Sequence, residues 1–218
     1  MARFDLVIFD CDGVVVDSER IVFEVFGAFI RSLGVNLTDE ETREQFLGRT
    51  LAACMAIVEQ LSGKPPPLDA LERYTAERDR VLRERVQPVD GVREVLETLT
   101  TPYCIASSGG YDKMRITLGA TGLMPLFEGR LFSATEVARG KPAPDIFLFA
   151  AQRMGVDPSR TVVIEDTVNG VLAGCAAGMT VLGYVDLTPA ARLVEAGATL
   201  TFTHMRELPA LLDSSDAA

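Results

Sequence analysis

The chain has 218 residues, of which 48% are hydrophobic and 24% charged, and its formal net charge at pH 7 is −10. This composition is typical of a soluble globular protein, and the length is sufficient for a sizeable core in one domain or two. The negative charge argues against nucleic acid and membrane surfaces as partners, because both attract basic patches.

No apolar stretch approaches the length of a transmembrane helix, and residues 1–5 lead into a predicted strand without a signal-peptide pattern. The four cysteines form no Cys-x-x-Cys pair, and a single histidine leaves no zinc-ligand spacing. We therefore expect reduced thiols and a cytoplasmic location. No pattern in the sequence indicates an oligomeric state.

Short apolar runs alternate with helical patterns along most of the chain. The predicted strands are Leu6–Phe9, Tyr103–Ser107, Arg130–Ser133, Val162–Ile164, Thr180–Tyr184 and Thr199–Phe202. The predicted helices are Gly91–Leu99, Tyr111–Thr121, Pro144–Met154, Asn169–Ala177, Pro189–Ala196 and Met205–Leu212. This alternation predicts an α/β fold with a doubly wound, parallel, Rossmann-like sheet.

The region from about residue 18 to 86 differs, because it contains helical patterns and no good strand. Apolar residues at helical spacing run from Ile21 to Leu33, and Thr38-Asp39-Glu40-Glu41 has the form of a capping box. Two further helices are predicted over Thr50–Leu61 and Leu68–Arg85, on either side of three prolines.

Two domains follow from this organisation. We predict a Rossmann-like core of residues 1–17 and 87–218, and an inserted α-helical cap domain of residues 18–86. Hinges are expected near residues 13–18 and 86–90, and the cap would act as a lid that excludes water from the site.

Acidic residues stand where two predicted strands end. The first strand runs into Asp10 and Asp12, and the fourth runs into Glu165 and Asp166. Open parallel sheets bind ligands at the carboxyl ends of their strands. Because Mg²⁺ prefers oxygen ligands, carboxylates gathered at that edge predict a metal-dependent enzyme.

Each acidic pair also has a purely structural interpretation. Asp10 and Asp12 could flank a hairpin turn, since Asp12-Gly13 is common in type I′ turns. Asp166 or Thr167 could simply cap the helix that follows.

Two further side chains could hold a phosphate. Ser107 ends a predicted strand just before Gly109-Gly110, where a hydroxyl beside flexible backbone could bind a phosphate oxygen or form a turn. Lys141 lies among prolines just before a helix, and taken alone it would more often be a solvated surface lysine.

In chain order, Asp-x-Asp-Gly, a strand-end serine, Gly-Lys-Pro and Glu-Asp resemble the motifs of the haloacid dehalogenase-like (HAD) superfamily, in the branch with a helical cap after the first strand. The resemblance covers essentially the whole chain. It implies a phosphohydrolase acting on a small phosphorylated metabolite, such as a sugar phosphate. Its most specific stretches are Phe9–Val14, Gly140–Asp145, Ile164–Thr167 and Ala176–Met179.

The resemblance also assigns the chemistry. Asp10 would be the nucleophile that forms an aspartyl-phosphate, and Asp12 the general acid/base. Asp10, the backbone carbonyl of Asp12, and Asp166 would bind Mg²⁺, with Glu165 in or beside that shell.

Substrate binding is assigned in the same way. Ser107 and Lys141 would hold the phosphate, and Mg²⁺ with Lys141 would attract an anion despite the net charge. Gly48-Arg49 resembles the loop through which family caps reach the site, so Arg49 is a candidate for substrate contact. An exposed arginine in a helix connection is the alternative.

Other activities of the family require residues at particular positions. Mutases such as β-phosphoglucomutase carry a histidine soon after the nucleophile motif, where this chain has Val22, and its only histidine is His204. Family dehalogenases lack the aspartate matched by Asp12. A phosphonatase needs a Schiff-base lysine, whereas the one cap lysine, Lys64, precedes three prolines. A non-catalytic binding protein is the remaining alternative, because fold alone does not establish activity.

Overall fold

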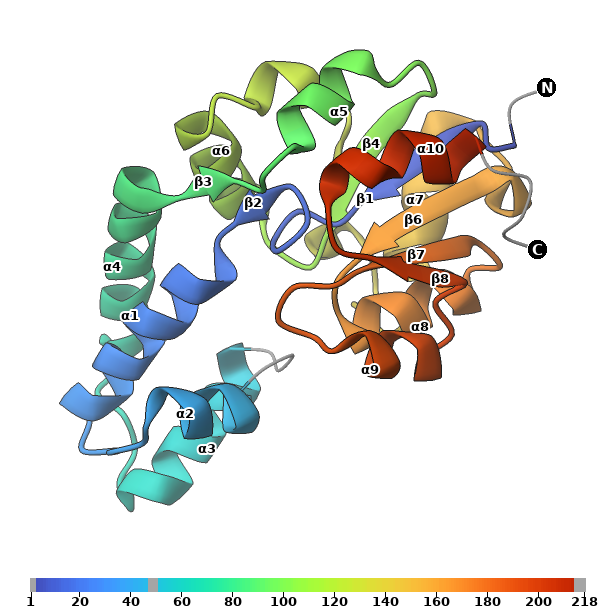
Figure 1. Cartoon of the computed structure of the whole chain (residues 1–218). Coiled ribbons are helices and arrows are strands. Elements are labelled where there is room, and N and C mark those ends of the chain that lie inside the picture. Colours follow the sequence, from blue (N-terminus) through green and yellow to red (C-terminus); the bar gives the residue numbers. More distant parts are fainter. Residues whose placement is uncertain (1–2, 47–50, 214–218) are drawn as a thin grey trace. The chain divides into compact units, whose positions relative to one another are not determined.

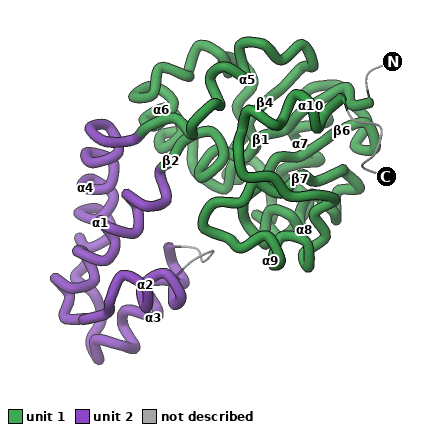
Figure 2. The backbone as a smooth tube through the Cα atoms, in the orientation of Figure 1, with its two compact units in different colours: residues 1–17, 87–218 green, residues 18–86 purple. Residues whose placement is uncertain are grey.

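The computed structural model describes residues 3–46 and 51–213, and the chain divides into two compact units. One unit comprises Met1–Asp17 and Gln87–Ala218, and the other comprises Ser18–Val86 (Figure 2). The first unit contains the sheet and the second is helical. That the helical unit serves as a cap stays a prediction.

In the described part of the first unit, six strands form one parallel sheet in the order β5-β4-β1-β6-β7-β8 (Figure 1). On either side of β1 the chain progresses in opposite directions, and such a switch point is where open α/β sheets bind ligands. The strands are β1 (Leu6–Phe9), β4 (Tyr103–Ser107), β5 (Leu131–Ser133), β6 (Thr161–Glu165), β7 (Thr180–Tyr184) and β8 (Leu200–Phe202).

Helices cover both faces of this sheet, so the predicted doubly wound α/β fold is confirmed. Every residue of β1, β4 and β6 is buried, as expected for central strands covered on both sides. One face packs against α7, α8 and α9, and on the other the ring of Tyr103 meets Phe9 and Phe127 edge-on. The helices and turns of this unit are α5 (Val92–Thr98), α6 (Tyr111–Ala120), η1 (Met124–Phe127), η2 (Ala134–Glu136), α7 (Asp145–Met154), η3 (Pro158–Arg160), α8 (Val168–Ala176), α9 (Ala190–Glu195), η4 (Met205–Glu207) and α10 (Leu208–Asp213).

Two short strands were not predicted. β2 (Val16–Asp17) and β3 (Gln87–Pro88) pair antiparallel at the two points where the chain passes between the units. The hairpin alternative for Asp12-Gly13 is wrong, because β1 is flanked by β4 and β6 and no return strand lies beside it. The chain instead turns at Gly13, whose φ of +81° suits a residue without a Cβ.

The helical unit contains α1 (Glu19–Ser32), α2 (Asp39–Phe46), α3 (Leu51–Ser62) and α4 (Ala70–Arg85). Phe26 of α1 is central to its core, with ring centroids 5.0 Å from Phe46 and 5.4 Å from Tyr74. The predicted capping box is confirmed. The Thr38 amide donates to the Glu41 carboxylate at 2.8 Å, and the Glu41 amide donates to Thr38 Oγ1 at 3.2 Å. Over residues 3–46 and 51–213, no helix combines the length and the apolar character that a bilayer-crossing segment requires.

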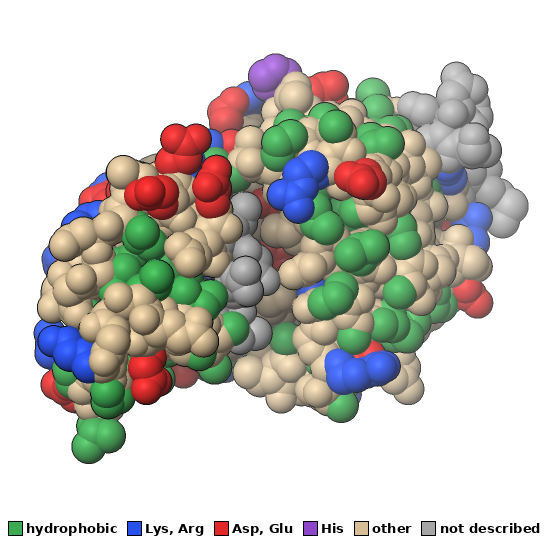
Figure 3. All heavy atoms as spheres, turned by 90° about the horizontal axis from the view of Figure 1, so that it is seen from below, with side chains coloured by type: hydrophobic (Ala, Val, Ile, Leu, Met, Phe, Trp, Pro, Cys, Tyr) green, Lys and Arg blue, Asp and Glu red, His purple; other side chains and the backbone are tan. Residues whose placement is uncertain are grey.

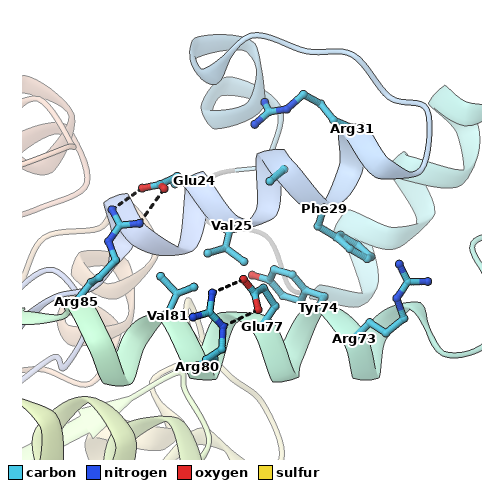
Figure 4. A pocket seen from close by; sticks show the side chains of 11 residues that line it. Glu24, Val25, Phe29, Arg31, Arg73, Tyr74, Glu77, Arg80, Val81 and Arg85 are labelled. Atoms are coloured by element: carbon cyan, nitrogen blue, oxygen red, sulfur yellow. Dashed lines mark hydrogen bonds and ion pairs between the residues drawn. The ribbon is translucent and has the colours of Figure 1, made fainter.

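A groove of about 540 Å³ lies between α1 and α4, within the helical unit (Figure 4). Its apolar lining includes Val25, Phe29 and Val81, and four arginines also line it. Each arginine already faces a carboxylate, so the groove carries little uncompensated positive charge for binding a phosphate. The ion pairs are Arg31–Asp39, Arg73–Asp69, Arg80 with Glu77 and Glu84, and Arg85–Glu24.

Candidate active site

Charged side chains collect at the carboxyl ends of β1 and β6. Asp10 directly follows β1, and its amide donates to the carbonyl of Ile164 in β6 at 2.9 Å. Glu165 ends β6 and Asp166 follows it. All three of these acidic side chains belong to buried residues. The structure therefore brings together the two acidic segments that the sequence places 155 residues apart, between Asp10 and Glu165.

Lys141 lies between these carboxylates. Its Nζ donates to Asp10 Oδ1, to Glu165 Oε1 at 2.7 Å and to the carbonyl of Ala106 at 3.1 Å. The amine also lies 4.7 Å from the centroid of the Phe147 ring. All three donors of the ammonium group are thus engaged, and the side chain is only 4% exposed. The surface-lysine alternative is wrong.

Burial and the opposite charge of the partner shift the pKa values of Asp10 and Lys141 in opposite directions. Burial raises the pKa of Asp10 to about 7, more than the adjacent Lys141 lowers it. Burial also lowers the pKa of Lys141, but attraction to Asp10 and Glu165 outweighs it and raises this pKa above its usual value. Lys141 is therefore a fixed positive charge beside a carboxylate whose pKa burial raises toward neutrality.

Glu165 is held by protein donors on both oxygens. Oε1 accepts from Lys141, and Oε2 accepts from the amides of Asp166 and Thr167 at 3.0 Å and from Thr167 Oγ1 at 2.9 Å. Gly170 makes room for this carboxylate, since a Cβ there would lie 1.8 Å from Glu165 Cδ. The contacts of Glu165 are those of a residue that anchors Lys141.

Asp166 lies against the turn that follows β1. A Cβ added to Gly13 would lie 2.2 Å from Asp166 Oδ2, so this carboxylate fills the space that glycine leaves. The helix-cap alternative holds for Thr167, because its Oγ1 accepts from the amide of Gly170 at 3.1 Å. Thr167 performs the capping that was the structural alternative for Asp166.

Asp12 and Ser107 face the same small space beside Gly109. A Cβ on Gly109 would lie 3.3 Å from Ser107 Oγ and 3.6 Å from Asp12 Oδ2. Ser107 is buried, and its Oγ accepts from the Gly109 amide at 2.9 Å, so the predicted turn is also present.

Lys113, which the sequence analysis missed, lies in the first turn of α6 with its Nζ 2.8 Å from Asp12 Oδ1. The sequence contains no clear signal of this contact, because Asp112 stands in the same helical turn and could itself compensate a cation near a helix N-terminus.

The carboxylate oxygens gathered at this site are of the kind that Mg²⁺ prefers. In the described residues, no group of three or more His, Cys, Asp or Glu side chains has an arrangement that could hold a metal ion. Mg²⁺ is commonly held by only one or two carboxylates, with water and substrate phosphate completing its octahedron. Asp10 and Asp166 can supply two. Four carboxylates also share the site with two lysines, so a dication would reduce the excess of negative charge; these residues are Asp10, Asp12, Glu165, Asp166, Lys113 and Lys141.

Gly48 and Arg49 fall outside the described residues, so the contact predicted for Arg49 stays a prediction. His204, the single histidine of the chain, is exposed on the surface of the sheet-containing unit (Figure 3).

A family model of haloacid dehalogenase-like hydrolases matches residues 4–178. The chain belongs to this family. It is 32% identical to 6-phosphogluconate phosphatase of Escherichia coli K12, over 97% of this chain and 96% of the relative.

Two solved structures of the family are also similar along nearly their whole length. A conserved haloacid dehalogenase-like protein of Agrobacterium tumefaciens is 39% identical with a TM-score of 0.85, and the match covers 96% of this chain and 97% of that one. A HAD family hydrolase of Deinococcus radiodurans, with bound phosphate and sodium, is 34% identical with a TM-score of 0.82, covering 97% and 96%. The predicted family and enzyme class, a HAD-like phosphatase, are confirmed.

Proposed function

We propose that this HAD-like phosphatase hydrolyses a small phosphorylated metabolite, a sugar phosphate or similar monoester, through a phosphoaspartate on Asp10 and with Mg²⁺. The observation that carries the proposal is the buried contact of Asp10 with Lys141 at the end of β1. This contact sets a carboxylate nucleophile beside a cation that can bind phosphoryl oxygens. The substrate of the E. coli relative and the phosphate bound to the D. radiodurans relative support the substrate class.

In the first half-reaction a carboxylate oxygen of Asp10 attacks phosphorus, and the bond from phosphorus to the leaving oxygen breaks. Asp12, in its acid form, gives its proton to that oxygen. As Asp10 bonds to phosphorus, Lys141 exchanges its hydrogen bond to Asp10 for one to a phosphoryl oxygen. Together with Ser107 it holds the phosphoryl oxygens and stabilises the charge that spreads over them.

In the second half-reaction Asp12, now a carboxylate, takes a proton from water while the water oxygen attacks phosphorus. The bond from phosphorus to Asp10 breaks, which frees phosphate and restores the Asp10 carboxylate. Asp12 is thereby protonated again for the next turnover.

Asp10, Asp166 and the backbone carbonyl of Asp12 would hold the Mg²⁺, and we place Glu165 outside this set because Lys141 and the turn after β6 engage both of its oxygens. The ion would supply positive charge that lets one anion approach another. Lys141 supplies the same kind of charge from the protein side.

Hydrolysis is favoured over phosphoryl transfer between sugar hydroxyls. The histidine that β-phosphoglucomutase-like enzymes carry early in the cap is replaced by Val22, and His204 is exposed. We expect hexose 1- and 6-phosphates to yield free phosphate. Rapid interconversion of the two isomers with little phosphate released would instead establish a mutase.

The mechanism is tested with an aryl phosphate, whose leaving group departs without protonation. Asp10→Asn should abolish turnover, because an amide is a poor nucleophile and no phosphoenzyme can form. Asp12→Asn should still form phosphoenzyme but break it down slowly, because the base is missing. Asp112→Asn, which changes an exposed carboxylate on α6, is the control. Wild-type rates in Asp10→Asn would exclude the nucleophile assignment.

A further inference from the structure

Lys113 has no role in the chemistry described so far, yet its surroundings are those of a functional side chain. It pairs with Asp12 at 2.8 Å, and the two side chains are only 19% and 18% exposed. Exposed ion pairs contribute little to stability, and many of the other pairs in the described chain are of that kind. A half-buried pair on the general acid/base calls for a different explanation.

Lys113 stands near the N-terminus of α6, where the helix dipole disfavours a cation. Lys113 is the third residue of the helix, where the backbone amides already carry partial positive charge. A lysine there is disfavoured unless it faces an anion, and the anion it faces is Asp12. The local sequence therefore suits this contact rather than the stability of the helix alone.

The two oxygens of Asp12 face different neighbours. Oδ1 contacts Lys113, whereas Oδ2 lies on the side of Gly109 and Ser107. A Cβ on Gly109 would also come within 3.7 Å of Lys113 Cδ, so the lysine stem borders the same space. Lys113 therefore holds one oxygen of Asp12 and leaves the other directed to the side where Ser107 stands.

We propose that Lys113 is a positioning residue that orients the Asp12 carboxylate as general base for hydrolysis of the phosphoenzyme. This inference rests on the proposed function. Lys113 donates a hydrogen bond to one oxygen of Asp12, and the other oxygen takes the proton of the attacking water. In the same step the bond from phosphorus to Asp10 breaks. Lys113 keeps its own protons throughout and acts only through Asp12.

An aryl phosphate substrate distinguishes a Lys113 that positions Asp12 from one that contacts phosphate or only stabilises α6. Formation of phosphoenzyme from such a substrate needs no general acid, so it reports on Asp10 and the phosphate-binding groups. Breakdown needs a base and reports on Asp12. A residue that contacts phosphate would affect formation and KM, whereas a residue that only stabilises α6 would affect neither half-reaction selectively.

The experiment compares wild type with Lys113→Met and Lys113→Arg, using rapid mixing and acid quench in the presence of Mg²⁺. In Lys113→Met we expect phosphoenzyme to form within about twofold of the wild-type rate and to break down about tenfold or more slowly, since general bases contribute 10²–10⁴. The steady-state phosphoenzyme level should rise. Lys113→Arg should restore most of the breakdown rate, because a guanidinium also donates to a carboxylate. Arg115→Met, which removes an exposed cation of the same helix, should match wild type.

A double variant tests whether the effect passes through Asp12. In Asp12→Asn, adding Lys113→Met should slow breakdown no further, because the group that Lys113 positions is already lost. If the two substitutions instead slowed breakdown independently, so that their effects multiplied, the proposal would be overturned. The same holds if Lys113→Met raised KM and slowed phosphoenzyme formation. It also holds if Lys113→Met slowed both half-reactions equally and lowered the unfolding midpoint. Absence of any phosphoenzyme in wild type would overturn the proposed function itself, which is a separate result.

Discussion

Lys141 Nζ lies 2.7 Å from Glu165 Oε1, and the two side chains are only 4% and 1% exposed. Such a pair is stable as a pair, but removal of one charge leaves the other buried without compensation. Because Lys141 also reaches Asp10, the carboxylate of Glu165 helps to fix the position of Lys141 beside Asp10. Glu165 would then affect catalysis without touching substrate or metal.

Glu165→Gln tests this assignment. The amide oxygen can still accept from the backbone after β6, but the charge that faces Lys141 is gone. We expect kcat to fall at least tenfold and the free energy of unfolding to fall by about 3 kcal/mol. The Mg²⁺ concentration for half-maximal activity should stay within about twofold of wild type. Glu195→Gln, at an exposed position of α9, is the control. A large loss of Mg²⁺ affinity would show that Glu165 is a ligand.

Gly13→Ala tests the approach of Asp166 to the turn after β1. The new Cβ would lie 2.2 Å from Asp166 Oδ2, at a φ of +81°. Gly155→Ala provides a matched control, because its φ is +72° and no atom lies within 4 Å of an added Cβ. Both variants should lose about 1–2 kcal/mol from backbone strain, as measured by denaturant unfolding. Only Gly13→Ala should also lose Mg²⁺-dependent activity; equal activities would exclude a role for this contact.

Asp166→Asn tests the metal site. The substitution keeps the shape of the side chain and removes an anionic oxygen ligand, so half-maximal activity should require at least about tenfold more Mg²⁺. Wild-type activity should disappear in EDTA and return when Mg²⁺ is added in excess. Full activity in EDTA would contradict the requirement for a divalent cation.

Tyr74 makes the stability of the helical unit sensitive to alkaline pH. Burial raises the pKa of this phenol to about 12, against about 10 in an unfolded chain. Below pH 10 the phenol is neutral in both states and its contribution is complete. Between pH 10 and 12 the unfolded state loses the proton first, so stability falls by up to about 3 kcal/mol. Denaturant titrations should show this loss in wild type and a smaller one in Tyr74→Phe. Identical pH profiles would contradict the shift.

Much of the fold was predictable because central strands of a parallel sheet are apolar on both faces. β1, β4 and β7 begin and end at the predicted residues. The short pair β2 and β3 was not predictable, since two residues on each side carry no periodic pattern and their pairing joins positions about 70 residues apart. The segment from Met205 was predicted as one helix, but the structure divides it into η4 and α10.

In the candidate site too, the positions of residues could be predicted from the local sequence, whereas their contacts could not. Asp10 and Ser107 could be located because each directly follows or ends an apolar run, and Asp166 because it comes one residue after such a run. The orientation of a side chain depends instead on neighbours distant in sequence. Glu165 was predicted in or beside the metal shell, and its contact with Lys141 could not be read from the sequence. Lys113 resembled any helical surface lysine until Asp12 was found beside it.

The antiparallel pair of β2 and β3 has a consequence for how this chain can be altered. Asp17 and Gln87 are cross-strand partners, so the chain leaves and re-enters the sheet-containing unit at positions whose Cα atoms are only about 5 Å apart. A two-residue turn spans such a distance in ordinary hairpins. Residues 18–86 could therefore be exchanged for a turn, or for another insert of any length whose ends meet, without changing the register of a single strand in the large sheet. We therefore expect the sheet-containing unit to keep its fold when residues 18–86 are replaced, so that the inserted unit can vary while the strand ends of the large sheet stay as they are.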